Sequence, residues 1–424
     1  MIAILGGGIS GISAGYHLSL KGINNTVYEK RSTWGGLCDN FTIGDDFRFD
    51  YFIHLSFTSS DIVKKLFSES SEYFIHHPIS NNYYKGSWLK HPAQNNLAPL
   101  SSTEKVKIIL DFINKPSGIN PQNYKEWLTI QFGEYFTNNF PGIYTAKYWT
   151  VPAKELTTDW LVGRFSLPPL ENLLKGAFEE QEENFYYAQE MRYPKKGGYK
   201  NFLTGMATNT KIQTNKDIVL IDLETKRIEF ADNSYVHYEK LISSLPLPEL
   251  VKRIKDVPRN ILEASQKLVC TSGQLVSLGF NRPDVPKNIW FYIYDEDILP
   301  ARAYSPSIKS PDNVPQGKSS LQFETYYSRF SPQKLSGDDL IEHVMEKGEK
   351  MKLWTASDIE VSDYREVKYA NVIFDFEREK NVTIIHNYLK QADINYIGRF
   401  GEWDYLWSDQ SLLSGKKIAD LYQI

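Results

Sequence analysis

Residues 1–11 read MIAILGGGISG, and this stretch decides the fold. The first five residues are apolar, which is typical of a buried parallel strand. Gly6, Gly8 and Gly11 then spell G-x-G-x-x-G, a motif that combines a tight turn, a close approach of backbone to pyrophosphate and close packing of helix on strand. Apolar residues at 12, 16 and 20 predict a helix whose free N-terminal N–H groups face the phosphates. The stretch therefore predicts a dinucleotide site.

A second predicted strand ends in Glu29, where a carboxylate meets a ribose hydroxyl in this kind of fold. The chain continues as E-K-R-x-x-x-G-G, with Lys30 and Arg31 followed by Gly35 and Gly36. The glycine pair lets a second backbone segment approach the cofactor, and Arg31 can offset diphosphate charge. This pattern resembles the extended FAD signature of the amine oxidase and UDP-galactopyranose mutase superfamily. The resemblance implies that these residues bind FAD.

The composition is that of a soluble globular protein with room for two or three lobes: 424 residues, 41% hydrophobic and 24% charged. The formal net charge of −4 argues against nucleic-acid binding as the main activity. Aromatic residues are frequent, with 27 Tyr among them. Such side chains offer large amphipathic surfaces to a sugar or a flavin.

The two cysteines, Cys38 and Cys270, provide neither a disulfide framework nor metal-ligand spacing, so we expect no metal site and a reducing compartment. No basic segment precedes the first apolar run and no cleavage pattern follows it, which favours a strand over a signal peptide. No apolar run approaches the roughly 18 residues that a membrane span needs. These features predict a cytoplasmic protein with no membrane span.

Changes of pattern along the chain predict an α/β fold. After the opening strand and helix, the sequence predicts a hairpin and an apolar strand within 212–248. It predicts a further strand and helix after residue 396. By resemblance to the same superfamily, we expect a glutathione-reductase-like, Rossmann-like FAD-binding domain with a helical insertion and an antiparallel-sheet substrate domain. The expected bounds are 1–80, 191–265 and 385–424 for the discontinuous FAD-binding domain, 81–190 for the helical substrate lobe and 266–384 for the antiparallel sheet.

Gly398 and Arg399 fall in a strand–glycine–helix element near the end of the chain. In the superfamily such an element closes the FAD site, and its helix N-terminus faces the flavin. Backbone N–H groups there can stabilise negative charge on the reduced flavin, to which Arg399 would add a full positive charge.

Two motifs in the middle of the chain resemble the eukaryotic-type UDP-galactopyranose mutases. Lys147 and Trp149 match K-x-W-x-x-P, and Arg164 matches the later G-x-R. Tyr292 and Arg302 match the strand that carries a substrate tyrosine and a second arginine. The resemblance implies that the tryptophan stacks on the uracil region and that both arginines bind the substrate diphosphate, for which bidentate charge-assisted hydrogen bonds are well suited.

Further candidates follow from the same resemblance. Lys309 stands where the family has a tyrosine, and a lysine suits a site beside a diphosphate. Tyr388 and Tyr405 could bond the phosphates through their hydroxyls, although a core or rim position suits a lone tyrosine equally well. His54 lies in the segment 50–54, which is bulkier than the family's Gly-Gly-His segment beside the flavin. Arg164, Arg302 and His54 are the predicted catalytic residues.

The leading hypothesis is an FAD-dependent sugar-nucleotide mutase that interconverts the pyranose and furanose forms of a nucleotide-diphosphate hexose for surface polysaccharide synthesis. By resemblance, N5 of the reduced flavin attacks the anomeric carbon, and an electron donor is needed only to prime the FAD. The sequence leaves open the sugar, the base and the existence of a homo-oligomer.

Two alternatives come from other classes. One is an FAD-dependent oxidoreductase of the amine oxidase or protoporphyrinogen oxidase type, for which an apolar channel with a single carboxylate anchor would argue. The other is a flavoprotein without catalytic activity in a polysaccharide pathway. The paired arginines with K-x-W count against the first, and the presence of Arg164, Arg302 and Arg399 counts against the second.

Overall fold

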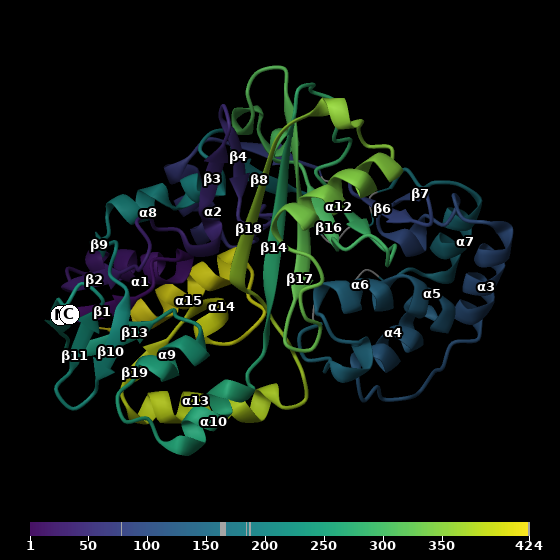
Figure 1. Cartoon of the computed structure of the whole chain (residues 1–424). Helices are drawn as coiled ribbons and strands as arrows, with labels where there is room; N and C mark the ends of the chain where they lie inside the picture. Colours follow the sequence, from purple (N-terminus) through teal and green to yellow (C-terminus); the bar gives the residue numbers. More distant parts are fainter. Residues whose placement is uncertain (78, 162–166, 184, 186–187, 423–424) are drawn as a thin grey trace.

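The computed structural model describes residues 1–77, 79–161, 167–183, 185 and 188–422. A small parallel sheet lies on the left of Figure 1, a sheet with long strands runs through the middle, and a group of helices lies on the right. This mixed α/β architecture confirms the predicted fold class.

The parallel sheet holds the first residues of the chain at its centre, in the order β19-β13-β1-β2-β9. Every neighbouring pair in it is parallel. Its strands are β1 (Ile2–Leu5), β2 (Asn25–Tyr28), β9 (Ile212–Gln213), β13 (Lys240–Ser243) and β19 (Ile394–Tyr396). Three separate parts of the chain therefore build one Rossmann-like unit.

Both faces of this sheet are covered, which explains why β1 is apolar throughout. Ile2 and Ile4 join the core under α1 (Ile9–Leu20) and α15 (Ser408–Asp420). The alternate residues, Ala3 and Leu5, join a core on the opposite face. That core is completed by β10 (Ile218–Asp222), β11 (Arg227–Phe230), β12 (Tyr235–His237), α9 (Leu247–Arg253), α10 (Arg259–Lys267) and α13 (Arg378–Gln391).

The central sheet has seven strands in the order β18-β14-β17-β16-β15-β6-β7, antiparallel except for the pair β15–β6. They are β6 (Asn81–Tyr84), β7 (Ser87–Lys90), β14 (Cys270–Phe280), β15 (Trp290–Ile293), β16 (Arg302–Tyr304), β17 (Ser319–Tyr327) and β18 (Ile359–Val372). The hairpin β6–β7 falls within the range expected for the helical lobe, yet it extends this sheet. The helix α12 (Gly337–Lys350) lies in front of the sheet in Figure 1.

The helical lobe packs against the sheet through one aromatic-rich core. The helical lobe comprises α3 (Ser102–Ile113), α4 (Tyr124–Phe132), α5 (Glu134–Asn139), α6 (Pro141–Tyr148) and α7 (Leu170–Phe178). The other elements are β3 (Asn40–Ile43), β4 (Phe47–Asp50), β5 (Tyr73–His76), β8 (Met191–Pro194), α2 (Asp61–Ser70), α8 (Thr204–Thr208), α11 (Pro306–Lys309) and α14 (Gly398–Gly401). Short 3₁₀ helices lie at 36–38, 93–95, 153–155, 199–203, 311–313 and 356–358.

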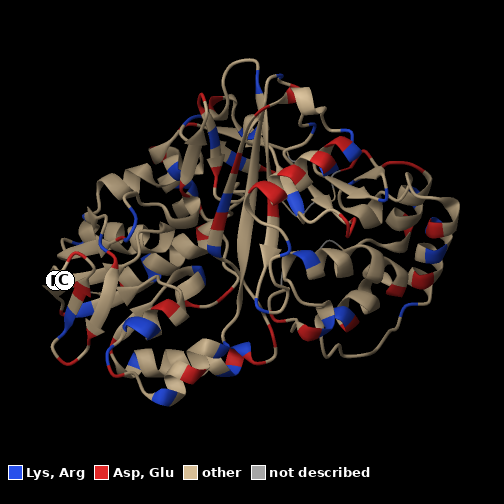
Figure 2. Cartoon of the chain, in the orientation of Figure 1, with Lys and Arg blue, Asp and Glu red and all other residues tan. Residues whose placement is uncertain are grey.

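Charge is mixed over the whole chain: Figure 2 shows basic and acidic residues interspersed on the elements of both halves. Among the described residues, no helix is both long and apolar enough to cross a membrane. The same part of the chain contains no group of three or more His, Cys, Asp or Glu side chains that could hold a metal ion.

Candidate functional site

The glycine-rich loop after β1 packs so closely that two of its positions exclude a side chain. A Cβ on Gly6, whose φ is +96°, would lie 2.4 Å from Ser244 Oγ, and one on Gly11 would lie 2.0 Å from the Gly6 oxygen. Gly8 differs, because a Cβ there would meet protein only at 3.8 Å, on Gly36 Cα. Protein packing thus accounts for Gly6 and Gly11, whereas the space beside Gly8 is open to a ligand, as a pyrophosphate-binding loop requires.

Glu29 joins this loop to the second glycine pair. Its buried carboxylate accepts hydrogen bonds from Gly7 N at 2.7 Å and from Arg31 N at 2.9 Å. Arg31 Nη2 donates to the Gly36 oxygen at 2.7 Å, and Gly35 N donates to the Gly7 oxygen at 2.8 Å. The predicted residues therefore meet at the carboxyl ends of β1 and β2, the usual place for a dinucleotide in an open α/β sheet.

α14 begins at Gly398, against the N-terminus of α1. Gly398 has φ +74°, and a Cβ there would lie 2.1 Å from Ser10 Oγ. The next residue, Arg399, lines a cavity, and its Cζ lies 4.6 Å from the centroid of the Tyr405 ring. Within the described residues, the buried Arg399 Nε has no hydrogen-bond partner. A buried donor without a partner is costly, so the Nε of the partly buried Arg399 marks a place for an anion or a hydrogen-bond acceptor.

The cavity has a volume of about 370 Å³ and lies where the Rossmann-like unit, the central sheet and the helical lobe meet. Its charged and titratable lining includes His54, His91, Arg302 and Arg399. The aromatic lining consists of Phe57, Tyr124, Phe132, Phe136, Tyr144, Tyr148, Trp149, Trp160, Phe185, Trp290, Tyr292, Tyr294, Tyr405 and Trp407. An apolar cavity with a few convergent polar groups is typical of a small-molecule site.

Arg302 is held in place by a buried carboxylate. It lies directly opposite Glu324 in the β16–β17 register, and its Nε donates to Glu324 Oε2 at 2.5 Å. Its Nη2 donates to the Tyr326 hydroxyl at 3.3 Å, and its Cζ lies 5.2 Å from the centroid of the Tyr148 ring. Arg302 therefore enters the cavity in a fixed orientation, as bidentate recognition of an anion requires.

Trp149 also lines the cavity, but it is buried to 3% exposure among other rings. The ring centroids of Tyr405 and Trp160 both lie 5.0 Å from that of Trp149. The hydroxyls of Tyr405 and Tyr148 lie 3.0 Å apart at the same wall. The structure thus brings Trp149, Tyr292, Arg302, Arg399, Tyr405 and His54 to one cavity.

His54 reaches the cavity from a backbone that carries a bulky residue in a glycine-like conformation. Phe52 has φ +66°, in the left-handed region that favours glycine. Its ring stacks on Tyr326 at 5.9 Å and 7°. The space for that ring comes from Gly273, since a Cβ on Gly273 would lie 2.5 Å from it. Burial lowers the pKa of His54 to about 4, so its imidazole is neutral near pH 7.

His91 is a cavity residue that sequence reasoning missed. Burial lowers its pKa to about 3. The Asn82 amide nitrogen donates to the Leu89 and Lys90 carbonyls, so its oxygen accepts from His91 Nδ1 at 3.1 Å. Only the H-P dipeptide marks this position in the sequence, and such a pair is too common to single out a site. Glu324 was missed as well, although a carboxylate in the middle of the strand SSLQFETYY is a signal for a buried partner.

Two of the predicted substrate-binding residues, Lys147 and Tyr388, lie away from the described lining of the cavity. Lys147 Nζ donates to two backbone carbonyls, of Ile293 at 2.8 Å and Asp295 at 3.1 Å. Burial lowers the pKa of this ammonium to about 7. Tyr388 lies on α13 and packs against the core beneath the parallel sheet. Neither belongs to the described lining of the cavity.

Lys309, a further predicted substrate-binding residue, does not belong to the described lining of the cavity either. Its ammonium is fully buried and lies 2.6 Å from Asp50 Oδ2, on a side chain that is also fully buried. It sits 4.3 Å from the ring centroids of both Tyr193 and Tyr304. Tyr199 N donates to the second oxygen of Asp50 at 3.1 Å. Lys309 is therefore half of a structural ion pair that fixes the start of the 50–54 segment.

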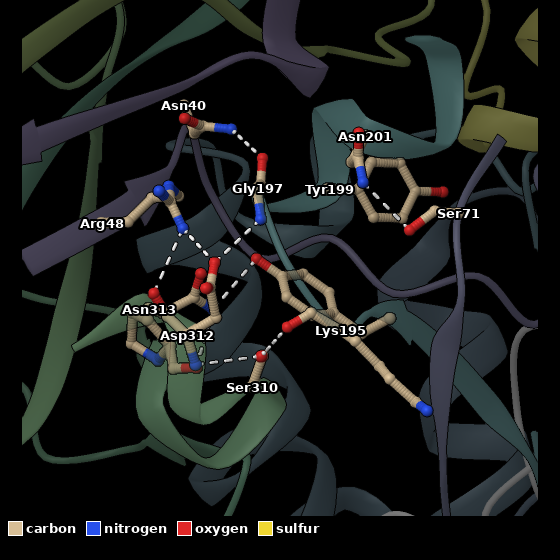
Figure 3. A network of polar contacts seen from close by, with 12 residues as sticks. Asn40, Arg48, Ser71, Lys195, Gly197, Tyr199, Asn201, Ser310, Asp312 and Asn313 are labelled. Carbon is tan, nitrogen blue, oxygen red and sulfur yellow. Dashed lines mark hydrogen bonds and ion pairs between the residues drawn. The ribbon is translucent and has the colours of Figure 1, made fainter. Parts of the chain in front are cut away.

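Figure 3 shows the polar contacts that hold the loop 195–198 after β8. Asp312 Oδ2 accepts from Gly197 N at 2.9 Å and from Arg48 Nη1 at 2.6 Å. Asn40 Nδ2 donates to the Gly197 oxygen at 2.9 Å, and Ser310 Oγ donates to the Lys195 oxygen at 2.6 Å. These bonds fix the loop that leads into Tyr199.

For two of the predicted site residues, Arg164 and Lys30, the described part of the structure gives no contact with the site. Arg164 lies outside the described residues. Lys30 is exposed, unlike its neighbour Glu29.

Comparison with known proteins supports the same fold. Residues 4–70 match the family model of an NAD(P)-binding Rossmann-like domain. A structure of reduced UDP-galactopyranose mutase is similar with a TM-score of 0.92 at 24% identity, over 99% of this chain and 93% of that one. A putative protoporphyrinogen oxidase from Exiguobacterium sp. 255-15 has a TM-score of 0.75 at 15% identity, over 99% and 98% of the two chains.

A variant of putrescine oxidase is also similar, with a TM-score of 0.66 at 16% identity over 99% of this chain and 98% of that one. The likeness to the mutase structure and to two kinds of oxidase extends over nearly the whole chain. Residues 4–70 match the model of an NAD(P)-binding Rossmann-like domain, and the chain as a whole shares the fold of these mutase and oxidase structures.

Proposed function

We propose that the protein is an FAD-dependent sugar-nucleotide mutase that interconverts the pyranose and furanose forms of a nucleotide-diphosphate hexose. The observation that carries the proposal is the cavity beside Gly398, which combines a closely packed aromatic lining with two arginines, Arg302 and Arg399. The similarity to UDP-galactopyranose mutase at a TM-score of 0.92 supports it.

The dinucleotide groove fits FAD. The space beside Gly8 and the N-terminus of α1 suit its pyrophosphate, and the Glu29 carboxylate suits a ribose hydroxyl. Arg31 and the pair Gly35–Gly36 border the same groove. The unsatisfied donor of Arg399 suits an electron-rich ring edge at the cavity. When bound and reduced, FAD supplies a nucleophilic nitrogen, N5, to the anomeric carbon of the sugar.

The side chains of the cavity perform the remaining tasks. Arg302 binds the diphosphate, the role we also propose for Arg164, and keeps the leaving group close to the sugar. Trp149 offers an aromatic contact to the base, and Tyr292 and Tyr405 offer hydroxyls to the phosphates. The neutral His54 closes the cofactor side without adding charge. The aromatic walls exclude water, which strengthens each polar contact.

The experiment is an anaerobic incubation of the FAD-loaded protein, reduced with dithionite, with UDP-galactose, UDP-N-acetylgalactosamine and dTDP-fucose in parallel. We expect a furanose product from at least one of them, and none from the oxidised protein. Arg302→Gln is expected to abolish it, and the exposed Arg259→Gln serves as the matched control. Absence of product from the whole panel would contradict the proposal.

A second candidate is an FAD-dependent oxidoreductase. The predominance of aromatic walls favours it, because an oxidase of amines or reduced rings needs an apolar channel. Consumption of oxygen during turnover of an amine or a reduced ring compound would support this candidate over the first. The electron donor that primes the flavin, a role in surface polysaccharide synthesis and a cytoplasmic location belong to the first proposal alone.

A further inference from the structure

The two carboxylate oxygens of Glu324 accept hydrogen bonds from two different parts of the site, the segment 50–54 and Arg302. The Glu324 side chain is fully buried in β17. Oε1 accepts from the backbone N of Ile53 at 2.8 Å. Oε2 accepts from Arg302 Nε at 2.5 Å and from the Tyr326 hydroxyl at 2.5 Å. A carboxylate this deeply buried is stable only when it is paired and hydrogen-bonded, and here each oxygen serves a different element.

One of these elements is the segment 50–54, which delivers His54 to the cavity. Its start is fixed by the pair of Asp50 with Lys309. Its middle holds Phe52 at φ +66°, a conformation unfavourable for any residue with a side chain. Oε1 of Glu324 is the hydrogen-bond acceptor for the very next residue. The position of His54 therefore depends on where the Glu324 carboxylate lies.

The other element is Arg302. Because Nε is held by Glu324 and Nη2 by Tyr326, the guanidinium cannot turn freely. Within the described residues, Nη1 has no hydrogen bond, and Arg302 lines the cavity. An anion that binds Arg302 there competes with the carboxylate for the same positive charge.

We propose that Glu324 is a positioning residue that couples anion binding at Arg302 to the place of His54 on the cofactor side. The inference rests on the proposed function, in which the anion is the diphosphate of a nucleotide sugar. A ligand that pulls Arg302 from Oε2 shifts the carboxylate, and Oε1 carries the shift to Ile53 and His54. Coupling of this kind is reciprocal: the state of the cofactor side changes diphosphate affinity to the same extent that the diphosphate changes the cofactor side.

The test uses the FAD-loaded protein with UDP as the probe and inorganic pyrophosphate as a probe without a base. Two quantities are measured: the dissociation constant by calorimetry, and the change in the visible flavin spectrum at saturation. Glu324→Gln keeps an oxygen for Ile53 but turns an N–H₂ group toward Arg302. We expect its spectrum without ligand to match that of the native protein, its UDP affinity to rise by about tenfold because the competing carboxylate is gone, and its spectral response to UDP to vanish.

Tyr326→Phe is the matched control. It removes the hydroxyl that donates to Oε2 and accepts from Arg302 Nη2, but it keeps the ring against Phe52 and the hydrogen bonds from Arg302 Nε and Ile53 N to Glu324. We expect it to retain the spectral response to UDP. A readout that needs no variant is hydrogen exchange of the native protein, in which UDP is expected to change exchange of a peptide covering 50–54. If Glu324 were merely structural, UDP would change neither the flavin spectrum nor the exchange of this peptide through it, and Glu324→Gln would respond to UDP as the native protein does.

The outcomes separate the two proposals. If the native protein binds neither UDP nor pyrophosphate, the nucleotide-sugar function fails and this inference fails with it. If UDP binds the native protein without changing the spectrum or the exchange of the 50–54 peptide, the inference alone is overturned. The same holds if Glu324→Gln binds UDP with native affinity and a native spectral response.

Discussion

Three cations lie in or near the site, Lys309 fully buried and Arg302 and Arg399 partly buried, and each has a different relation to negative charge. Lys309 is fully buried with Asp50 and faces no cavity. Arg302 is paired with Glu324 yet lines the cavity. Arg399 lines the same cavity, and no carboxylate pairs with it among the described residues. The cost of burying a charge distinguishes them: Lys309 serves stability, Arg399 serves a ligand, and Arg302 serves both.

Removal of Arg399 is expected to change the cofactor and not the fold. Because no internal ion pair is lost, Arg399→Gln should unfold in urea within about 1 kcal/mol of the native protein. The loss of positive charge beside the flavin should lower its reduction potential by on the order of 30 mV, a tenfold change for a two-electron couple. Dye-coupled redox titration measures this. An unchanged potential together with a large loss of stability would contradict the assignment.

Removal of Lys309 is expected to lower the stability of the fold and to leave the cofactor unchanged. Lys309→Met leaves the Asp50 carboxylate buried without its cation and should destabilise the protein by about 3–5 kcal/mol. The double variant Asp50→Asn/Lys309→Met should recover most of this loss, because no charge then stays buried. Equilibrium unfolding in urea gives both values. A single variant as stable as the native protein would contradict the structural role.

Stability should fall as the pH falls from about 6.5 towards 4. Burial lowers the pKa of His54 to about 4 and that of His91 to about 3. The unfolded chain therefore takes up protons at both histidines before the folded chain does, and stability rises with pH in this window. Each histidine should contribute about 1 kcal/mol between pH 6.5 and 5.5. Urea unfolding at several pH values tests this, and His91→Asn should lose about 1 kcal/mol of the dependence between pH 6.5 and 5.5; an equal dependence would contradict it.

At the scale of elements, the strand β1, the loop after it and helix α1 form a unit in which each glycine has its own role. Gly11 is required by packing, whereas Gly8 borders open space. The loop can therefore be tested for ligand binding separately from folding.

Gly8→Ala should keep the fold and lose the cofactor. A Cβ there meets protein only at 3.8 Å, an ordinary contact, but it would occupy the space beside the pyrophosphate. We expect a native melting temperature for the cofactor-free protein and a clear loss of bound FAD, read from the ratio of absorbance at 450 and 280 nm, wavelengths characteristic of a flavin and of protein. Gly22→Ala, in the turn after α1, is the control for FAD content: its φ of +69° should lower stability, but no cofactor should be lost. Full FAD content in Gly8→Ala would contradict the role of this loop.

The sequence predicted the elements around this loop well, because their signals are local. A glycine motif, an apolar strand and a carboxylate at the end of the next strand all lie within 36 residues, and together they predict one fold. The cavity was harder to predict. A motif places Lys147 or Lys309 along the chain but does not say which way the side chain points, and both ammonium groups turn away to internal acceptors. Glu324 matters only through cross-strand register, which a single sequence does not give.

The segment 50–54 shows the same limit at finer detail. Its bulk argues from sequence against a Gly-Gly-His conformation, yet Phe52 takes a left-handed φ because distant residues hold it. Gly273 and Tyr326, from two other strands, supply the space and the stacking partner. Tertiary contacts outweigh local preference here, as they commonly do at functional sites.

At the scale of the molecule, the chain returns twice to the sheet where it began, and between these passes it builds the walls of a cavity. The parallel sheet combines strands from residues 2–28, 212–243 and 394–396. The helical lobe and the central sheet enclose the substrate side. One chain thus places a dinucleotide groove and an arginine-containing aromatic cavity next to each other.

The central claim is that this arrangement catalyses an isomerisation without net oxidation. The most direct measurement is the number of furanose products formed per flavin when the FAD-loaded protein, reduced once with dithionite and kept anaerobic, is given a nucleotide-diphosphate hexose. The account predicts many products per flavin, with the flavin still reduced at the end. One product or fewer per flavin, or turnover that proceeds only as oxygen is consumed, would contradict it.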